Sequence, residues 1–247
     1  MPRPQYTAVL TQKTALSDNT IELVLTFEQK TVFLFEAGQF VQLLFEHNGK
    51  THKRSYSIAN SPEEVSQTRA LRIAISAVAG GMATDYFATA AIGSVIQVTG
   101  PFGVLTLAKE IPGQLILVGT GTGVAPYHSM IPQLERLADK GTPITLVMGG
   151  RYRRELIYRD AFMNLAQDYP VVDYSICLSR ESSENLKTRE HTGYVQHLFN
   201  HLNLAPGNDI VYLCGNPAMV DDAARALQGL SFANKKIKRE KYVYSGH

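Results

Sequence analysis

The feature that most constrains the fold is a change in hydrophobic pattern near residue 110. Before it, from Tyr6 to about Leu107, apolar residues fall in short β-rich segments separated by turn residues. These segments are 20–27, 39–45, 52–58, 71–77 and 94–99. Because little helical periodicity separates them, they predict a small antiparallel barrel or sandwich, interrupted by one helix near residues 84–91.

Beyond residue 110, apolar strands alternate with segments of helix length. The predicted strands are 114–118, 144–148, 171–178 and 210–214, and the predicted helices are 128–140, 155–167, 194–201 and 217–228. Strands buried on both faces and joined by helices are typical of a parallel doubly wound sheet. We therefore expect an all-β antiparallel barrel domain over residues 1–109 and an α/β doubly wound parallel sheet over residues 110–247.

Composition excludes several classes of function. The 24 Lys and Arg against 22 Asp and Glu give a net charge of +2, too small for a nucleic-acid partner bound over the whole surface. The N-terminus has no apolar core of signal-peptide length, and no apolar run reaches the ~20 residues that cross a bilayer. We expect a cytoplasmic protein without a membrane partner.

The cysteines and histidines do not indicate a metal site. Cys177 and Cys214 are the two cysteines of the chain and lack metal-ligand spacing, which argues against structural zinc or an iron–sulfur cluster. His197 and His201 lie four apart on a predicted helix, but no acidic third ligand accompanies them. We expect no metal, so any electrons would be carried by an organic cofactor.

The motif Arg54-Ser55-Tyr56-Ser57 stands at the end of a predicted strand. A flavin requires a positive charge for its phosphates, a flat apolar surface for its ring and a hydrogen-bond partner near the nitrogen that accepts hydride. Alternation along a strand puts Arg54 and Tyr56 on one face, with Ser57 on the other unless the strand twists or ends there. The alternative is an ordinary edge strand with a surface arginine and a half-buried tyrosine.

A second flavin signal is the run Gly80-Gly81-Met82-Ala83-Thr84, just before the predicted helix of the first domain. Backbone amides and a hydroxyl at a helix N-terminus can bind a diphosphate. The alternative is a plain loop in which Thr84 is the N-cap. Two such signals in one barrel favour a flavin.

The run Gly119-Thr120-Gly121-Thr122-Gly123 follows a predicted strand directly and allows a phosphate to approach the backbone. Its spacing differs from the usual dinucleotide fingerprint, and no acidic residue about twenty positions further on offers itself to a ribose hydroxyl. Taken alone, this glycine cluster is a weak indication of a second nucleotide site.

Arginines stand where the next predicted strands end: Arg151 after 144–148, and Ser179-Arg180 after 171–178. Ligands of open α/β sheets bind at those carboxyl ends, and arginine in place of an acidic residue suits a 2′-phosphate, which favours NADPH over NADH. Solvated loop charges are the alternative for both arginines.

The last predicted strand ends with Cys214-Gly215-Asn216-Pro217-Ala218-Met219 on the same edge. A thiol and a small residue there can lie against a nicotinamide ring, whereas a cysteine buried at a strand end is often inert packing. The sequence leaves both possibilities open, and we include Asn216 and Met219 among the candidate cofactor-binding residues.

Together, the motifs Arg54-Ser55-Tyr56-Ser57, Gly119 to Pro126, Ser179-Arg180-Glu181 and Cys214-Gly215-Asn216-Pro217 resemble those of the ferredoxin–NADP reductase family. Their order and spacing match across nearly the whole chain, and the short bacterial members are the most similar. The resemblance implies an FAD-binding barrel followed by an NADP-binding α/β domain.

The resemblance also implies a role for each motif. In the flavin domain, Arg54 would bind the diphosphate with Gly81, Met82, Ala83 and Thr84, Tyr56 would pack on the ring, and Ser57 would lie near its N5 atom. In the other domain, Thr122 would contact the NADP backbone, Arg151, Ser179 and Arg180 would surround the 2′-phosphate, and Cys214 would lie beside the nicotinamide.

The C-terminus departs from the pattern of this family. Relatives often end with an aromatic or small residue against the flavin just after a Glu-Lys or Glu-His pair, and here Glu240-Lys241 is followed by Tyr242 and later by Tyr244. Either tyrosine would cover the ring and act as a gate for the nicotinamide. Tyr194 replaces a third basic residue that some relatives use for the 2′-phosphate.

The mechanism implied is hydride transfer from NADPH to FAD, followed by release of single electrons to ferredoxin or flavodoxin, with Ser57, Cys214 and Tyr242 at the reacting rings. We expect a monomer, whose basic run 235–241 is either a docking surface for an acidic carrier or a solvated helix face. The alternatives are a free-flavin reductase, an oxygenase reductase component, or a flavin redox sensor without turnover.

Overall fold

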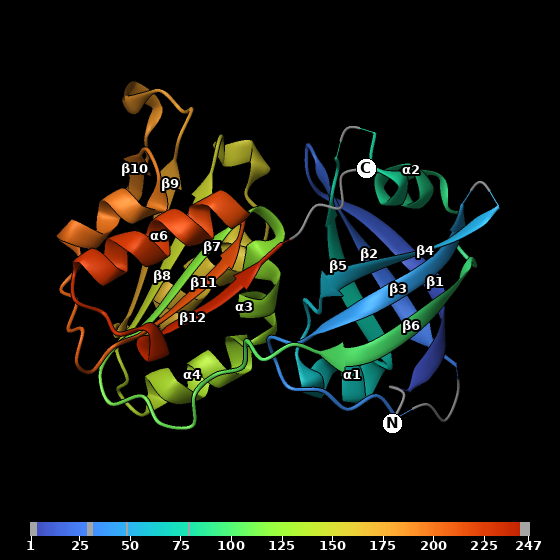
Figure 1. The fold of residues 1–247 in the computed structure, drawn as a ribbon, viewed down its shortest axis with the longest axis horizontal. Helices are drawn as coiled ribbons and strands as arrows, with labels where there is room; N and C mark the ends of the chain where they lie inside the picture. Colours follow the sequence, from blue (N-terminus) through green and yellow to red (C-terminus); the bar gives the residue numbers. More distant parts are fainter. Residues whose placement is uncertain (1–3, 29–31, 48, 79, 243–247) are drawn as a thin grey trace. The chain divides into compact units, whose positions relative to one another are not determined.

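The computed structural model describes residues 4–28, 32–47, 49–78 and 80–242. They form two compact units (Figure 1). The first unit contains the described residues up to Leu107 together with Ala125–Met130, and the second contains Ala108–Val124 and the described residues from Ile131 onward. Within these ranges, the chain therefore returns to the first unit once after leaving it.

The first unit is an antiparallel barrel. Its strands are β1 (Gln5–Ser17), β2 (Thr20–Phe27), β3 (Phe40–His47), β4 (Lys50–Ser57), β5 (Ala70–Ser76) and β6 (Val95–Phe102), in the order β4-β3-β6-β1-β2-β5. An antiparallel bridge between Ile58 and Ile73 joins the two ends of the sheet. The predicted antiparallel barrel is confirmed, although β1 lies outside the predicted segments.

Apolar side chains at alternating strand positions fill the barrel interior. In β2, for example, Leu23, Leu25 and Phe27 are buried, so one face of the strand supplies the core.

The unit has two longer helices, α1 (Pro62–Thr68) and α2 (Met82–Thr89), and the prediction of a single helix is wrong. The missed helix α1 begins with Pro62, and its N-cap Ser61 accepts a hydrogen bond from the Glu64 amide.

The second unit is a parallel sheet. Its strands are β7 (Leu115–Thr120), β8 (Ile144–Gly150), β9 (Val172–Leu178), β10 (Glu190–Thr192), β11 (Ile210–Gly215) and β12 (Ile237–Lys241), in the order β10-β9-β8-β7-β11-β12. The direction of winding reverses between β7 and β11, which is the point where doubly wound sheets bind ligands. The predicted doubly wound parallel sheet is confirmed.

Helices cover both faces of this sheet. They are α4 (Ile131–Asp139), α5 (Arg159–Asp168), α6 (Pro217–Gly229) and the 3₁₀ helices η1 (Gly121–Val124), η2 (Arg153–Glu155), η3 (Ser183–Asn185), η4 (Val195–His201) and η5 (Asn234–Lys236). In Figure 1, α6 lies in front of the sheet, and it shares an apolar cluster with η4. On the other face, Phe162 of α5 packs against Tyr174 of β9.

Several predicted elements are corrected. The helix expected over 128–140 is divided into α3 (Ala125–Ser129) and α4, and the helix expected over 155–167 begins at Arg159. The segment 194–201 is a 3₁₀ helix. The basic run 235–241 is not a helix face, because η5 leads into the strand β12. Within the described ranges, no helix combines the length and apolar character needed to cross a membrane.

Candidate functional site

The end of β4 carries the first candidate motif. Arg54 and Tyr56 are half-buried while Lys53 and Ser55 are exposed, so Arg54 and Tyr56 share a face as alternation predicts. Ser57 is the last residue of the strand, and 5% of it is exposed. The strand therefore ends at Ser57. A change in backbone direction at this point would allow the Ser57 side chain to lie on the same side as Arg54 and Tyr56.

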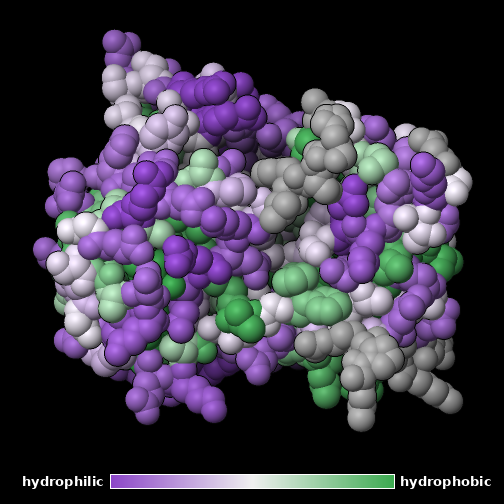
Figure 2. All heavy atoms as spheres, in the orientation of Figure 1, coloured by the Kyte–Doolittle hydropathy of each residue, from purple (hydrophilic) through white to green (hydrophobic). Residues whose placement is uncertain are grey.

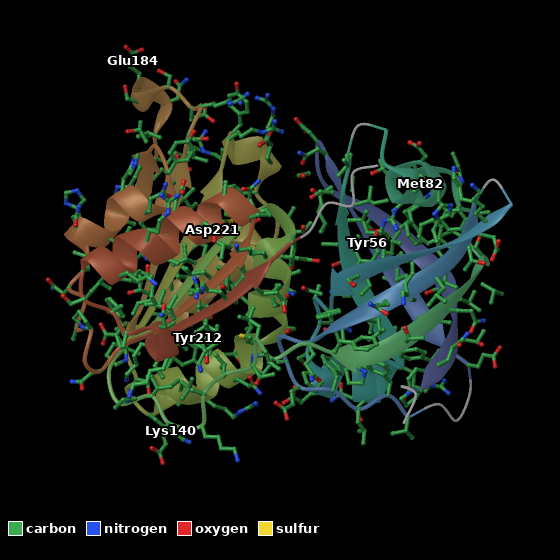
Figure 3. The ribbon with its side chains drawn as sticks, in the orientation of Figure 1. Tyr56, Met82, Lys140, Glu184, Tyr212 and Asp221 are labelled. Atoms are coloured by element: carbon green, nitrogen blue, oxygen red, sulfur yellow. The ribbon has the colours of Figure 1, made fainter. Side chains whose placement is uncertain are left out.

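Tyr56 presents an apolar surface rather than a charge. Its ring lies 6.3 Å from the ring of Phe87 in α2, nearly perpendicular to it, and Figure 3 shows Tyr56 on the same side of the barrel as Met82, the first residue of α2. Burial raises the pKa of the Tyr56 phenol, and the nearby charge of Arg54 opposes that shift. The phenol is therefore uncharged near neutral pH.

Arg54 supplies a positive charge beside this ring. Its guanidinium donates a hydrogen bond to the Lys53 carbonyl at 2.8 Å. In the described part of the chain it has no carboxylate partner. A phosphate group would therefore meet a cation that no acidic side chain neutralises.

Helix α2 offers backbone amides at its N-terminus. Gly81 is the N-cap, and no side chain caps this helix end. Thr84 lies in the first turn, where its hydroxyl accepts a hydrogen bond from the Val78 amide at 2.9 Å, so the alternative with Thr84 as N-cap is wrong. The uncapped end, which includes the amides of Met82 and Ala83, is suited to an anion.

The opposite end of α2 is held by a lysine that sequence reasoning missed. The Nζ atom of Lys13 in β1 donates to the carbonyls of Phe87, Ala88 and Ala90 at 3.0, 2.8 and 3.1 Å. A cation at a helix C-terminus satisfies its carbonyls and opposes the negative end of its dipole. Lys13 therefore fixes the helix whose other end carries the candidate diphosphate site.

Helix α3 also contributes to the first unit. The Nδ1 atom of His128 lies 2.6 Å from the Ala59 carbonyl, and the Ser129 hydroxyl accepts a hydrogen bond from the Gly38 amide at 2.9 Å. Ala59 follows Ser57 by two residues, so His128 helps to hold the segment that leaves β4. This contact could not be predicted, because it joins a side chain to a backbone atom far along the chain.

In the second unit, the glycine-rich turn packs against the end of β11. A Cβ atom on Gly123 would lie 2.3 Å from the Cys214 carbonyl oxygen, and one on Gly215 would lie 2.6 Å from the Thr120 carbonyl oxygen. Both positions require glycine because both contacts are with backbone. Gly121, by contrast, has φ +55° and open space where a side chain would begin, so this part of the turn is accessible.

Cys214 and Tyr242 lie at this junction. Cys214 is completely buried, and burial raises the pKa of its thiol, with the charge of Glu240 adding to the shift and a hydrogen bond to Tyr242 opposing it. The Tyr242 hydroxyl donates to the Thr122 carbonyl at 3.0 Å, and its amide donates to the Gly215 carbonyl at 2.9 Å. The structure thus places Tyr242 at the glycine-rich turn, and Tyr244 lies outside the described residues.

Two further candidates after β11 have structural contacts. The Asn216 side chain accepts hydrogen bonds from the amides of Ala218 and Met219 and caps α6. Met219 is half-buried and packs against the apolar cluster under α6. Asn216 is exposed, at the edge where β7 and β11 end.

The three candidates for a 2′-phosphate site lie together at the ends of β8 and β9. The Ser179 amide donates to the Gly150 carbonyl at 3.0 Å, and the Arg180 amide donates to the Arg151 carbonyl at 2.9 Å. Arg180 is exposed and, within the described ranges, has no carboxylate partner. Arg151 instead pairs with Glu155, a residue that sequence reasoning did not single out.

Acidic residues also engage Arg153, and these contacts hold the segment between β9 and β10. Arg153 forms a two-pronged ion pair with Glu190, and its amide donates to a Glu181 carboxylate oxygen at 3.2 Å. Figure 3 shows Glu184 of the same segment at the tip of a projection from the sheet. Figure 2 shows that hydrophilic residues predominate on the surface of this unit above α6. No sequence motif indicates that Arg153 forms these contacts within the protein.

Two family models match the chain. A model described as an oxidoreductase FAD-binding domain matches residues 7–107, and one described as an oxidoreductase NAD-binding domain matches residues 117–225. The chain is 33% identical over 227 residues to ferredoxin–NADP reductase B from Sorangium cellulosum, covering 88% of this chain and 90% of the relative.

Two more distant likenesses involve longer proteins. The phenol hydroxylase P5 protein of Acinetobacter pittii is 32% identical over 211 residues, which cover 85% of this chain and 58% of that protein. The crystal structure of a cytochrome P450 reductase from Amycolatopsis superimposes with a TM-score of 0.86 at 27% identity, covering 98% of this chain and 71% of the other. This chain thus spans little more than half the length of the phenol hydroxylase relative.

Proposed function

Because the chain belongs to the ferredoxin–NADP reductase family of flavin-dependent oxidoreductases, we propose that it transfers hydride between NADP(H) and FAD and single electrons to or from ferredoxin or flavodoxin. The observation that carries the choice of NADP(H) is the clustering of Arg151, Ser179 and Arg180 at the ends of neighbouring parallel strands. Guanidinium groups at this edge suit a 2′-phosphate, which NADH lacks.

The donors of the first unit fit a flavin dinucleotide. Arg54 has no carboxylate partner among the described residues, and the N-terminus of α2 has no side-chain cap, so both can bind a diphosphate. Tyr56 supplies an uncharged ring for the isoalloxazine. Ser57, at the strand end, is the candidate hydrogen-bond partner for the flavin N5.

The second unit fits a nicotinamide dinucleotide in an equivalent way. The accessible backbone at Gly121, next to Thr122, stands at the reversal point between β7 and β11, where such ligands bind. Cys214 stays a neutral thiol because burial raises its pKa, so it places no negative charge beside the ring. Tyr242 braces this turn through its hydrogen bond to Thr122.

When bound, FAD converts the two-electron chemistry of nicotinamide into the one-electron chemistry of a protein carrier. The contribution of the chain is to bind and orient rather than to transfer protons. Arg54 and the amides of α2 anchor the phosphates, Tyr56 orients the ring, and Ser57 holds a hydrogen-bonding atom in a nearly buried position.

Anaerobic titration of the purified yellow protein tests this function. NADPH is expected to bleach the flavin absorbance at lower concentration than NADH, and addition of oxidised ferredoxin or flavodoxin is expected to restore it. A preparation that is colourless and takes up no FAD when supplied would contradict the flavin site. Equal response to the two nicotinamides would contradict the NADP preference alone.

The relatives support a second candidate, the reductase component of an oxygenase. The names of two similar proteins, the phenol hydroxylase P5 protein and the cytochrome P450 reductase, refer to oxygenase systems. This function uses the same two cofactor sites with a different acceptor. Acceptor assays distinguish the possibilities: an oxygenase reductase would reduce its oxygenase component faster than ferredoxin or flavodoxin, and a free-flavin reductase would turn over FMN faster than either protein.

A further inference from the structure

Glu155 holds Arg151 in a two-pronged ion pair. The Arg151 Nε atom donates to Glu155 Oε2 at 3.0 Å, and its Nη2 atom lies 2.8 Å from Glu155 Oε1. Two of the five guanidinium donors are thus engaged by one carboxylate. The side chain of Arg151 is 52% exposed and that of Glu155 is 15% exposed, so the arginine of this pair is open to solvent while its partner is mostly buried.

The two candidate phosphate arginines therefore differ in charge balance. Arg180 has no carboxylate partner in the described part of the chain, whereas the charge of Arg151 is offset by a carboxylate within hydrogen-bonding distance. A phosphate that reaches Arg151 also approaches the charge of Glu155. Its attraction to the cation is then reduced by repulsion from the anion.

Two neighbouring arginines have contacts of their own. Arg153 is engaged by Glu190 and, through its amide, by Glu181. The guanidinium of Arg154 lies over the Tyr152 ring, 4.4 Å from its centroid. Glu155 is the carboxylate that contacts a candidate phosphate-binding residue directly.

We propose that Glu155 is a specificity-determining residue that weakens recognition of the 2′-phosphate by neutralising Arg151. This inference rests on the proposed NADP(H) site. It assigns the discrimination between NADP(H) and NAD(H) to Arg180, with Arg151 contributing little while Glu155 is charged. Removing the carboxylate charge then releases the second arginine and strengthens the preference for a 2′-phosphate.

Isothermal titration calorimetry of the full-length flavoprotein tests the proposal without catalysis. The ligands are adenosine 2′,5′-bisphosphate and 5′-AMP, which differ in the 2′-phosphate alone. The quantity measured is the dissociation constant of 5′-AMP divided by that of the bisphosphate, so a higher ratio means stronger preference for the 2′-phosphate. Glu155→Gln is expected to raise that ratio in favour of the bisphosphate by about threefold to fivefold, the size of one exposed charge pair. Glu155→Met, which also removes the charge, is expected to do the same.

Two comparisons make the result specific. Asp222→Asn removes a carboxylate that pairs with Arg225 on the exposed face of α6, and it is expected to leave the ratio unchanged. Arg151→Ala is expected to reduce the ratio more in the Glu155→Gln protein than in the wild type, because the arginine contributes fully when its partner is neutral.

A change of this ratio in the opposite direction, or no change, would overturn the proposal. If Glu155→Gln lowers the ratio or leaves it unchanged, Glu155 orients Arg151 for the phosphate or plays no part in recognition. Failure of the NADP(H) site itself has a different signature. In that case Arg180→Ala does not change the ratio, and the wild type and Glu155→Gln both bind the two ligands equally, which overturns both ideas together.

Discussion

The two glycine-containing turns look alike in sequence, but one glycine in each, Gly80 and Gly123, meets an opposite physical demand. At Gly80, with φ +69°, a side chain would find no atom within 4 Å, so glycine is favoured there by backbone conformation. At Gly123, a Cβ atom would lie 2.3 Å from backbone, so glycine is required there by packing. A glycine cluster in a sequence therefore indicates a special turn, but it does not say whether that turn faces a ligand or the protein itself.

The strongest test of this difference is Gly123→Ala. Its methyl group would collide with the Cys214 carbonyl and Gly215 Cα, neither of which can move without disturbing β11. We expect a loss of about 3 kcal/mol in unfolding free energy and weakened binding of NADPH. Urea unfolding and calorimetry measure these effects. Gly121→Ala is the matched control for stability, and equal losses of unfolding free energy in the two variants would refute the packing argument.

Lys13→Met tests the helix that follows the first turn. Removing the ammonium leaves the carbonyls of Phe87, Ala88 and Ala90 without this donor, which should destabilise the last turn of α2 by about 1–2 kcal/mol. Weaker retention of FAD is expected as well, and fluorescence of released flavin measures it. Lys50→Met, which changes an exposed lysine of β4, should have little effect.

Gly80→Ala should cost about 1 kcal/mol, because alanine disfavours a positive φ even in open space. Asparagine at the same position should restore part of that loss, since it tolerates the left-handed conformation better. Thermal unfolding followed by flavin absorbance measures both variants. A larger loss than that of Gly123→Ala would reverse the contrast between the two turns.

The smallest effect concerns pH and His128. Burial lowers the pKa of His128, and its hydrogen bond to Ala59 and the charges of Glu22 and Glu64 oppose that shift while Arg72 reinforces it. The unfolded chain, with a His pKa of about 6.5, then binds a proton more readily than the folded chain. This contribution to stability should be complete above about pH 7.5 and decline as the pH falls through 6.5.

The measurement is the urea midpoint between pH 7.5 and 5.5. His128→Gln should flatten the profile relative to the wild type, whereas substitution of the exposed His191 by glutamine should not. A wild-type midpoint that rises on acidification, or an unchanged slope in His128→Gln, would exclude this role.

The fold class could be predicted because the spacing of apolar residues along the chain differs between the barrel and the parallel sheet. Buried runs such as 115–120 and 210–215 are bounded by turn residues and separated by helix-length segments, and the barrel strands alternate. Two elements with a single buried residue were missed: Val65 is the one buried side chain of α1, and Ile237 is the one buried side chain of β12. Such elements are fixed by caps and by pairing with a neighbouring strand, which hydrophobic periodicity does not report.

The candidate site was predictable to a similar extent. Motif positions led to Arg54, Tyr56 and Arg180 because each side chain stands at the end of a recognisable strand. The roles of Lys13, His128 and Glu155 were not predictable, because their partners are backbone carbonyls or a side chain in a turn whose path the sequence does not specify. The position of Tyr242 has the same cause, since it donates to the carbonyl oxygens of Thr122 and Gly215.

The return of α3 to the barrel has a consequence for dissecting this protein. A polypeptide that stops at Leu107 would keep every barrel strand, yet the Gly38 amide and the Ala59 carbonyl would lose their partners in α3. A polypeptide that starts at Ala108 would carry α3 away from the residues on which it packs. Halves expressed separately should therefore be less stable than their strand content suggests, and a chimaera that exchanges the flavin module with a relative would have to exchange residues 125–130 along with it.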